Sequence, residues 1–179
     1  MIQPESRTLL TVVVPVCNEE GVLPAFHDRL AVVLDGLPLA AEVIYVDDGS
    51  SDNSRELIEQ FCEGDGRMAL LALSRNFGKE IAMTAGLDHA SGDAVVIIDA
   101  DLQDPPELIP QLVDKWREGY DVVYARRTDR DGESWLKKAT AKAFYRVIHH
   151  AANLEIPRDT GDFRLLSRRA VEALRRLPE

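Results

Sequence analysis

The sequence predicts an α/β fold in which a mostly parallel sheet is covered by helices on both faces. Short apolar runs of strand character alternate with helical patterns from Leu9 to Ala125. Such a βαβ order builds a parallel sheet between layers of helices. Polar motifs follow each of the first five predicted strands, and α/β sheets bind ligands beyond the carboxyl ends of their strands.

The expected elements follow one another in a regular order along the chain. Apolar runs too short for helices predict strands, and apolar residues at helical spacing predict helices. The predicted strands are 9–16, 42–46, 68–73, 94–98, 121–125 and 162–166. The predicted helices are 20–34, 53–62, 79–90, 106–118, 134–150 and 167–177. The Pro-Pro pair that ends at Pro106 supports the fourth helix, because proline is tolerated in a first helical turn.

Length and composition indicate one globular domain spanning residues 1–179. A chain of 179 residues can bury a sizeable core. No apolar run has the length needed to cross a bilayer, and the polar start lacks a signal-peptide pattern, so we expect a cytoplasmic protein. Cys17 and Cys62 lack metal-type spacing and are expected to be reduced thiols.

The charge of the chain is acidic and unevenly distributed. The net charge of −10 argues against a nucleic acid partner, which needs a basic face. Residues 1–104 hold 6 Lys/Arg against 19 Asp/Glu, a net charge of −13, whereas residues 105–179 hold 15 against 12, a net charge of +3. This asymmetry fits ordinary surface variation. It also fits an acidic half that holds metal and nucleotide and a more basic half that meets a second anion.

The apolar run 94–98 ends in two carboxylates, Asp99 and Asp101. Residues two apart on extended backbone point to the same side, so the two carboxylates can converge just past the strand end. Such charges repel each other unless a cation lies between them. Mg²⁺ or Mn²⁺ takes oxygen ligands and brings phosphates with it. With Gln103 and a Pro-Pro pair following, the pattern favours a metal site over a chance loop.

Two further motifs allow both a structural and a binding interpretation. Asp47-Asp48-Gly49-Ser50 is typical of a turn, but paired acids also suit the N–H and hydroxyl groups of a base and a ribose. The loop 74–79 contains Arg75, Gly78 and Lys79, which could approach a diphosphate. Its glycine spacing is not that of a Walker loop, and no dinucleotide fingerprint follows the first strand.

Two other segments have strong structural interpretations. Asn18-Glu19-Glu20 by itself favours a cap at the start of the next helix, since Asn is a good N-cap and acids suit a first turn. The basic segment 134–150 fits either a solvated helix face or a surface for an anionic acceptor or a membrane.

Together these motifs resemble the family 2 glycosyltransferases of the GT-A fold, in their polyprenyl-phosphate glycosyltransferase branch. The resemblance rests on residues 13–20, 46–52, 74–79 and 99–106, with Gly161-Asp162-Phe163-Arg164-Leu165-Leu166 added, and covers residues 11–171. It implies a Rossmann-like GT-A sheet. Many members of this branch continue into juxtamembrane and transmembrane helices, which a chain ending at Glu179 is expected to lack.

The resemblance also implies roles for individual residues. Asp99, Asp101, Arg126 and Asp162 would be catalytic, and Asp99, Asp101 and Gln103 would bind Mg²⁺ or Mn²⁺. The nucleotide sugar would contact Pro15, Asn18, Glu19, Asp47, Asp48, Gly78, Lys79, Asp99, Ala100 and Asp101, with Asp47 and Asp48 at the base and ribose. The acceptor phosphate would meet Arg126, Arg127, Lys137 and Lys138.

The activity implied is a metal-dependent, inverting transfer of a sugar from a nucleotide-diphosphate sugar to a polyprenyl phosphate. The resemblance favours UDP-glucose over GDP-mannose as the donor. It implies a reaction at the cytoplasmic face of a membrane and is compatible with a homo-oligomer. Two alternatives stay open: transfer to a sugar hydroxyl, with Asp159 or Asp162 as base, and binding of a nucleotide sugar without turnover. A phosphoaspartate-forming phosphatase is disfavoured, because its motif ends the first strand and has Thr or Val at the position of Gln103.

Overall fold

The computed structural model describes residues 8–126 and 160–176. Two compact units are present, one formed by residues 1–124 with 162–179 and the other by residues 125–161. The predicted helix 134–150 and the basic residues Arg127, Lys137 and Lys138 lie outside the described residues.

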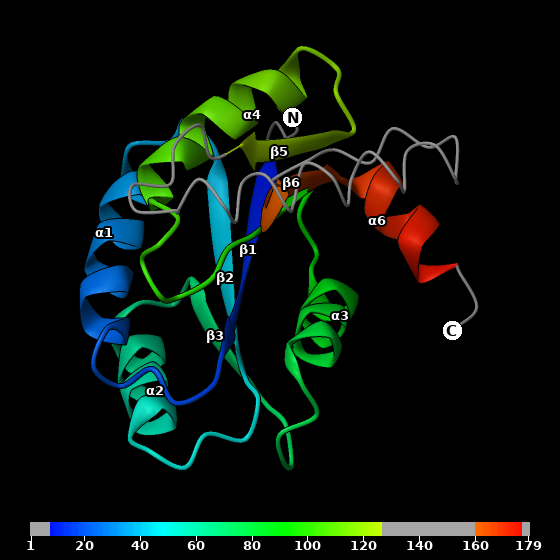
Figure 1. Ribbon diagram of the computed structural model, residues 1–179. Helices are drawn as coiled ribbons and strands as arrows, with labels where there is room; N and C mark the ends of the chain where they lie inside the picture. The colour runs from blue at the N-terminus through cyan, green and yellow to red at the C-terminus, as the bar shows by residue number, and fades with distance from the viewer. Residues whose placement is uncertain (1–7, 127–159, 177–179) are drawn as a thin grey trace, which may run out of the picture. The chain divides into compact units, whose positions relative to one another are not determined.

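Six strands form one sheet in the order β3-β2-β1-β4-β6-β5 (Figure 1). The strands are β1 (Leu9–Val16), β2 (Ala40–Asp47), β3 (Met68–Ala72), β4 (Ala94–Ile97), β5 (Val122–Arg126) and β6 (Thr160–Ser167). Strands β1 to β4 pair in parallel, whereas β6 runs antiparallel to β4. The predicted mostly parallel sheet is therefore confirmed.

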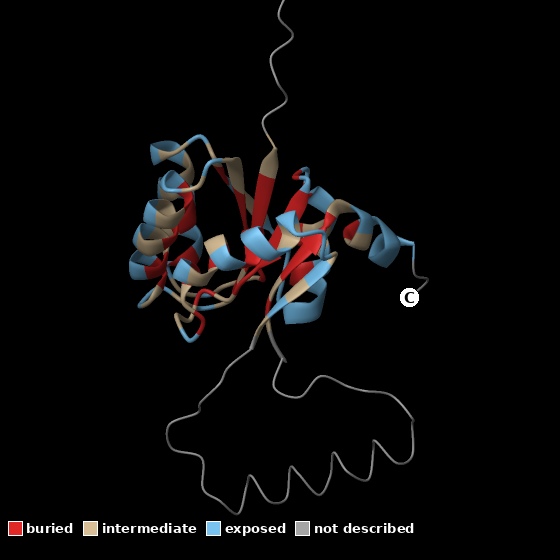
Figure 2. Cartoon of the chain, turned by 90° about the horizontal axis from the view of Figure 1, so that it is seen from above, coloured by how far each residue is buried: buried red, intermediate tan, exposed pale blue. Residues whose placement is uncertain are grey.

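Helices cover both faces of this sheet. They are α1 (Leu23–Asp35), α2 (Ser54–Gly64), α3 (Lys79–His89), α4 (Ile109–Arg117), preceded by the 3₁₀ turn η1 (Pro106–Leu108), and α6 (Arg168–Arg175). In Figure 1, α1 and α2 lie on one side of the sheet and α3 and α6 on the other. The central strands are consequently buried on both faces, and Figure 2 shows them in red beneath helices whose outer surfaces are exposed. Continuous apolar runs such as Val12-Val13-Val14, all fully buried, are what such strands require.

Helix α3 lies very close to the sheet because Gly86 has no side chain. A Cβ atom at Gly86 would lie 2.3 Å from Cγ1 of Val13 and 3.1 Å from Cγ2 of Val46. Around this contact, α3 and α6 share a buried cluster with the sheet. Its members include Val13, Ile97, Met83, Leu166 and Val171. This close approach fixes the distance between α3 and the sheet. It thereby helps to position Lys79, the first residue of α3.

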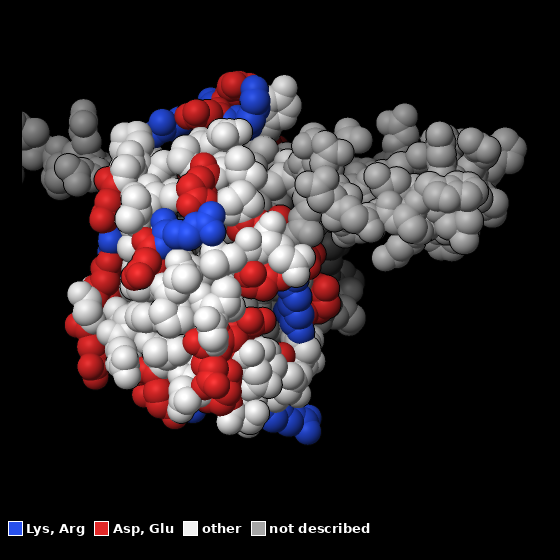
Figure 3. All heavy atoms as spheres, turned by 60° about the vertical axis from the view of Figure 1, so that its left-hand side comes forward, with Lys and Arg blue, Asp and Glu red and all other residues white. Residues whose placement is uncertain are grey.

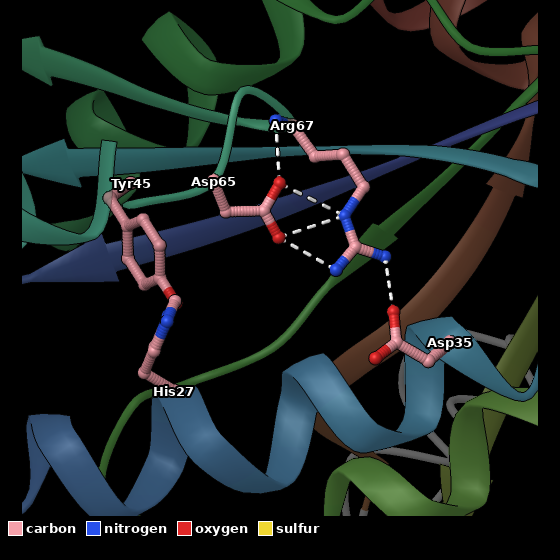
Figure 4. A network of polar contacts seen from close by, with 5 residues as sticks. All are labelled: His27, Asp35, Tyr45, Asp65 and Arg67. Carbon is pink, nitrogen blue, oxygen red and sulfur yellow. Dashed lines mark hydrogen bonds and ion pairs between the residues drawn. The ribbon is translucent and has the colours of Figure 1, made fainter. Parts of the chain in front are cut away.

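The opposite face contains a packed aromatic group, of which Figure 4 shows His27 and Tyr45. His27 of α1 stacks on Phe61 of α2 with ring centroids 3.8 Å apart, and its Nδ1 lies 3.0 Å from the hydroxyl of Tyr45. Beside it, Arg67 pairs with Asp65 and Asp35. The aromatic contacts fasten α1 and α2 to β2 through Tyr45.

Several boundaries differ from those expected. Helix α1 begins at Leu23 rather than at residue 20, because the backbone carbonyl of Glu19 accepts the N–H groups of Val22 and Leu23 in a turn. The Pro-Pro segment first forms η1 and only then α4. Within the described ranges, no helix combines the length and apolarity that a membrane span requires. Acidic side chains are spread over the face drawn in Figure 3, in keeping with the net charge of −10.

We predict that Gly86→Ala destabilises the protein although alanine favours helices. The new methyl group would collide with Val13, and overpacking of a core typically costs about 1–3 kcal/mol. The matched control is Gly64→Ala in α2, where nothing lies within 4 Å of the place that the methyl group would occupy and a small gain is expected. Urea denaturation of both variants measures the difference, and equal stabilities would contradict the close packing.

We also predict that His27 makes stability depend on pH. Burial lowers the pKa of His27 below its usual value of 6.5, and Asp28 and Asp65 only partly oppose this. The unfolded chain therefore binds a proton more readily, so the contribution of neutral His27 is complete above pH 6.5 and is lost as the pH falls toward the folded pKa.

Denaturation between about pH 5 and 8 tests this dependence. His27→Gln should flatten the loss of stability below pH 6.5. His89→Gln, at an exposed position in α3, should leave that loss unchanged. If both variants keep the full pH dependence, another group causes it.

Candidate functional site

A cleft of about 300 Å³ opens at the carboxyl ends of β1, β2 and β4, beside the start of α3. Its lining consists of Pro15, Val16, Cys17, Glu19, Asp48, Asn76, Gly78, Lys79, Ala82, Asp99, Ala100 and Asp101. Four segments that are distant in sequence thus meet at one edge of the sheet, where α/β proteins bind their ligands.

The loop after β1 is fastened to the loop after β2 by side-chain bonds. Asn18 Oδ1 accepts the backbone N–H of Ser51 at 2.7 Å, and the backbone N–H of Glu19 donates to Ser54 Oγ at 2.8 Å. Glu20 Oε2 accepts the backbone N–H of Asn53. The helix-cap interpretation of Asn18-Glu19-Glu20 is therefore wrong, because α1 has no side-chain cap and these groups join two loops instead.

Asp47 and Asp48 are both buried but have different surroundings. Asp47 Oδ1 accepts the backbone N–H of Ser50 at 3.0 Å, as in a turn, and Asp47 does not line the cleft. Asp48 lines it and also accepts the backbone N–H groups of Phe77 at 2.8 Å and Gly78 at 2.9 Å. Asp48 therefore holds the loop between β3 and α3 against the sheet edge.

Gly49 makes this loop contact sterically possible. Its φ angle is +69°, and a Cβ atom there would lie 2.5 Å from the backbone of Arg75. Only glycine fits both the backbone conformation and the close approach. The Asp-Asp-Gly-Ser motif is thus explained by its own geometry, before any ligand is considered.

Acidic groups surround a single ammonium at the α3 end of the cleft. Lys79 Nζ lies 2.6 Å from Asp99 Oδ2 and 2.5 Å from Asp162 Oδ2. Burial raises the pKa of Asp99, and Asp162 and Asp101 add to this, whereas Lys79 lowers it. Burial lowers the pKa of Lys79, but its bonds to the two carboxylates outweigh burial and raise it. Burial raises the pKa of Glu19, and the negative charge of Asp101 raises it further. The carboxylates of the cleft therefore interact electrostatically with one another.

The carboxylate pair fits a divalent cation that keeps other ligands. Asp99 and Asp101 both line the cleft, and their oxygens are the ligands that Mg²⁺ and Mn²⁺ prefer. Across the described ranges, no group of three or more His, Cys, Asp or Glu side chains is placed to hold a metal. Two carboxylates match an ion such as Mg²⁺, which is usually completed by water and substrate phosphates. Leu102, at φ +59°, gives a strained turn directly after Asp101.

The predicted site residues divide into three groups. Eight line the cleft: Pro15, Glu19, Asp48, Gly78, Lys79, Asp99, Ala100 and Asp101. Asn18, Asp47, Gln103 and Asp162 do not line it, although Asp162 contacts Lys79. Arg126 ends β5, but its side chain is outside the described part, as are Arg127, Lys137 and Lys138.

Sequence reasoning missed four residues that line the cleft: Val16, Cys17, Asn76 and Ala82. Asn76 Nδ2 lies 3.2 Å from Cys17 Sγ. Asn76 lay within the predicted diphosphate loop, and Ala82 follows Lys79 by three residues, so it shares a helix face with Lys79. Cys17 was set aside because its spacing suggested no metal, and its position directly after β1 was the signal available.

The fold and the cleft define an α/β protein whose candidate ligand site lies beyond the carboxyl ends of parallel strands. The chain belongs to glycosyl transferase family 2, whose family model matches residues 11–175. The predicted family and fold are thereby confirmed.

Two curated relatives illustrate the similarity. An uncharacterized glycosyltransferase of Synechocystis sp. is 52% identical over 95% of this chain and 54% of its own length. The bactoprenol glucosyl transferase of Shigella phage SfV is 44% identical over 95% of this chain and 55% of its own length. The chain therefore spans about half the length of the curated relatives it matches.

Solved structures agree in fold. The mannosyltransferase PcManGT from Pyrobaculum calidifontis, in complex with GDP-Man and Mn²⁺, has a TM-score of 0.67 at 25% identity, over 98% of this chain and 49% of that one. Glucosyl-3-phosphoglycerate synthase from Mycobacterium tuberculosis, in complex with Mn²⁺, UDP-glucose and phosphoglyceric acid, has a TM-score of 0.65 at 23% identity, over 92% and 58% of the two chains.

We predict that Asp48→Asn loosens the loop before α3. The amide offers one carbonyl oxygen where the carboxylate accepts two backbone N–H groups, and a buried donor without an acceptor costs about 1–3 kcal/mol. Amide hydrogen exchange at Phe77 and Gly78 should accelerate and stability should fall. Asp114→Asn, on the exposed side of α4, is the control. Unchanged exchange at both amides would show that Asp48 does not hold the loop.

Proposed function

We propose that this protein is a metal-dependent, inverting glycosyltransferase that moves a sugar from a nucleotide-diphosphate sugar to a polyprenyl phosphate. UDP-glucose is the favoured donor, with GDP-mannose next, and residues 1–179 act as one catalytic domain at the cytoplasmic face of a membrane. The observation that carries the proposal is the meeting of Asp99 and Asp101 with Asp48 and Lys79 in one cleft. The name of the Shigella phage relative supports the glucosyl donor and the lipid acceptor.

The donor would lie along the half of the cleft formed by the ends of β1 and β2. Asp48 and Glu19 line that half, and carboxylates accept hydrogen bonds from ring N–H groups and ribose hydroxyls. Lys79 would contact the diphosphate, because its ammonium already lies beside Asp99. PcManGT supports this arrangement as a relative of the same fold that is crystallised with a nucleotide sugar.

Asp99 and Asp101 would hold the metal, with Gln103 following them in the same turn. A divalent cation, Mg²⁺ or Mn²⁺, would stabilise the negative charge that develops on the leaving diphosphate. Partial burial of Asp99 keeps water away from one side of this carboxylate. That strengthens its interaction with a cation relative to a fully exposed carboxylate.

In the proposed transfer, an oxygen of the acceptor phosphate forms a bond to the anomeric carbon of the sugar. The bond from that carbon to the nucleotide diphosphate breaks, and its electron pair leaves with the diphosphate. In-line attack inverts the anomeric centre. A phosphate monoester has a second pKa of about 6, so at neutral pH the nucleophile needs no general base.

A sugar hydroxyl acceptor is the second candidate, and it does need a base. Asp162 is the described candidate, since Asp159 is outside the described residues. The Oδ2 atom of Asp162 is bound to Lys79 at 2.5 Å, so a base role would fall to its Oδ1 atom.

We predict that Asp101→Asn lowers both Mn²⁺ affinity and sugar transfer. Replacing even the outer partners of metal ligands costs about 10- to 100-fold in metal affinity or activity, so the loss of a proposed ligand should cost at least about 10-fold. Paramagnetic resonance of free Mn²⁺, measured with UDP present, reports affinity. Product analysis with UDP-glucose and a polyprenyl phosphate reports transfer.

Asp114→Asn is the matched control, because it removes the same charge from an exposed position on α4. Parallel assays with a prenyl alcohol and with an oligosaccharide separate the acceptor classes. Unchanged Mn²⁺ affinity in Asp101→Asn would remove the metal role. Transfer by the wild type to the oligosaccharide alone would favour the sugar hydroxyl as acceptor. Binding of a nucleotide sugar without any transfer would indicate a binding protein rather than an enzyme.

A further inference from the structure

Arg164 of β6 has a buried nitrogen that no group satisfies. Its Nε atom is the one side-chain nitrogen or oxygen in the described part of the chain that is buried without a hydrogen-bond partner. Leaving a buried donor unpaired destabilises a protein, and more so when the group is charged. Such groups are rare in native proteins and need an explanation, which the donor and metal roles above do not supply.

The register of β6 places Arg164 on the same face of the sheet as the acidic cluster. Arg164 lies opposite Ile97 in the antiparallel β4–β6 pair, and Ile97 belongs to the buried cluster beneath α3. Side chains two apart on a strand share a face, so Asp162 lies on that face as well. The bonds from Lys79 to both Asp99 and Asp162 agree with this arrangement.

The carboxylate nearest to Arg164 in sequence does not pair with it. Asp162, two residues away, is paired with Lys79 instead, and no ion pair to Arg164 occurs between described residues. Arg164 as a residue is half-buried, and its guanidinium offers up to five donors in a planar fork that matches a phosphate or carboxylate. An anion that reaches this face would therefore find unpaired donors and a fixed positive charge.

The strand order indicates which anion this is. In the order β3-β2-β1-β4-β6-β5, β4 with Asp99 separates β6 from the strands whose ends form the proposed nucleotide half. In the proposed function, the donor diphosphate lies beside Asp99 and Lys79, toward β1. A second phosphate that approaches from the β6 side of β4 would meet β6 first.

We propose that Arg164 binds the phosphate of the acceptor, with its guanidinium directed to the phosphate oxygens that do not attack the sugar. This inference rests on the proposed function and adds an acceptor residue to it. The Gly161-Asp162-Phe163-Arg164 segment would then carry two tasks on one face: Asp162 pairs with Lys79, and Arg164 holds the acceptor.

The test compares Arg164→Gln and Arg164→Lys with the wild type. With UDP-glucose and Mn²⁺ present, the KM for the polyprenyl phosphate should rise about 10- to 100-fold in Arg164→Gln, as expected for the loss of charged hydrogen bonds. The Kd for UDP-glucose should stay the same. Arg164→Lys should recover part of the loss because it keeps the charge without the fork. Arg117→Gln, at an exposed position in α4, is the control.

A binding measurement makes the outcomes separable. Calorimetry with geranyl phosphate and with geraniol, in the presence of UDP and Mn²⁺, should show phosphate-dependent binding that is weakened in Arg164→Gln. If the wild type transfers sugar to the lipid phosphate and both Arg164 variants keep its KM, the inference is wrong and the proposed function stands. If the variants instead bind UDP-glucose more weakly, Arg164 contacts the donor and the inference is wrong. If the wild type neither binds geranyl phosphate nor uses the lipid phosphate, the proposed function fails and the acceptor role fails with it. If Arg164→Gln does not fold, the same measurements on Arg164→Lys test the inference.

Discussion

The ammonium of Lys79 between Asp99 and Asp162 is the interaction on which the rest of the site depends. Two like charges 4 Å apart repel by about 4 kcal/mol at an effective dielectric constant near 20. Without a cation, carboxylates at the ends of β4 and β6 could not approach each other closely. The ammonium is in turn fixed by packing: Gly86 lets α3 lie on the sheet, and Asp48 holds the loop that leads into Lys79.

This dependence joins distant parts of the chain. Lys79 and Asp162 are 83 positions apart in sequence, yet their charged groups are in contact. The contact arises because β6 inserts between β4 and β5, which brings a strand from late in the chain beside the carboxylates of an earlier one. The acidic pair and the β6 face therefore form one electrostatic unit, and a change in the charge of any member alters the others.

Local patterns predicted the sheet well, because alternating apolar runs and helical spacing depend only on neighbouring residues. The pair Asp99 and Asp101 was recognised for the same reason, since its spacing and its position after a strand are local. The different surroundings of Asp47 and Asp48 were not predictable, because the difference arises from a loop that begins 26 residues later and donates Phe77 and Gly78 N–H groups to Asp48 alone. The antiparallel direction of β6 also depends on long-range pairing.

The face shared by Asp162 and Arg164 has a consequence for the proposed choice of acceptor. A neutral alcohol entering this face would leave Arg164 without a countercharge and would gain nothing from Lys79, which is already paired with two carboxylates. A phosphate would satisfy the buried Nε atom and bring a negative charge that the neighbouring acids oppose unless a guanidinium or a metal balances it. If Arg164 binds the acceptor as proposed, the acids would disfavour a phosphate at positions on this face that lack a neighbouring cation. In the proposed arrangement, repulsion by the carboxylates and attraction by Arg164 would together orient the acceptor, so that selectivity for a phosphate would follow from the same charges that are proposed to hold the donor.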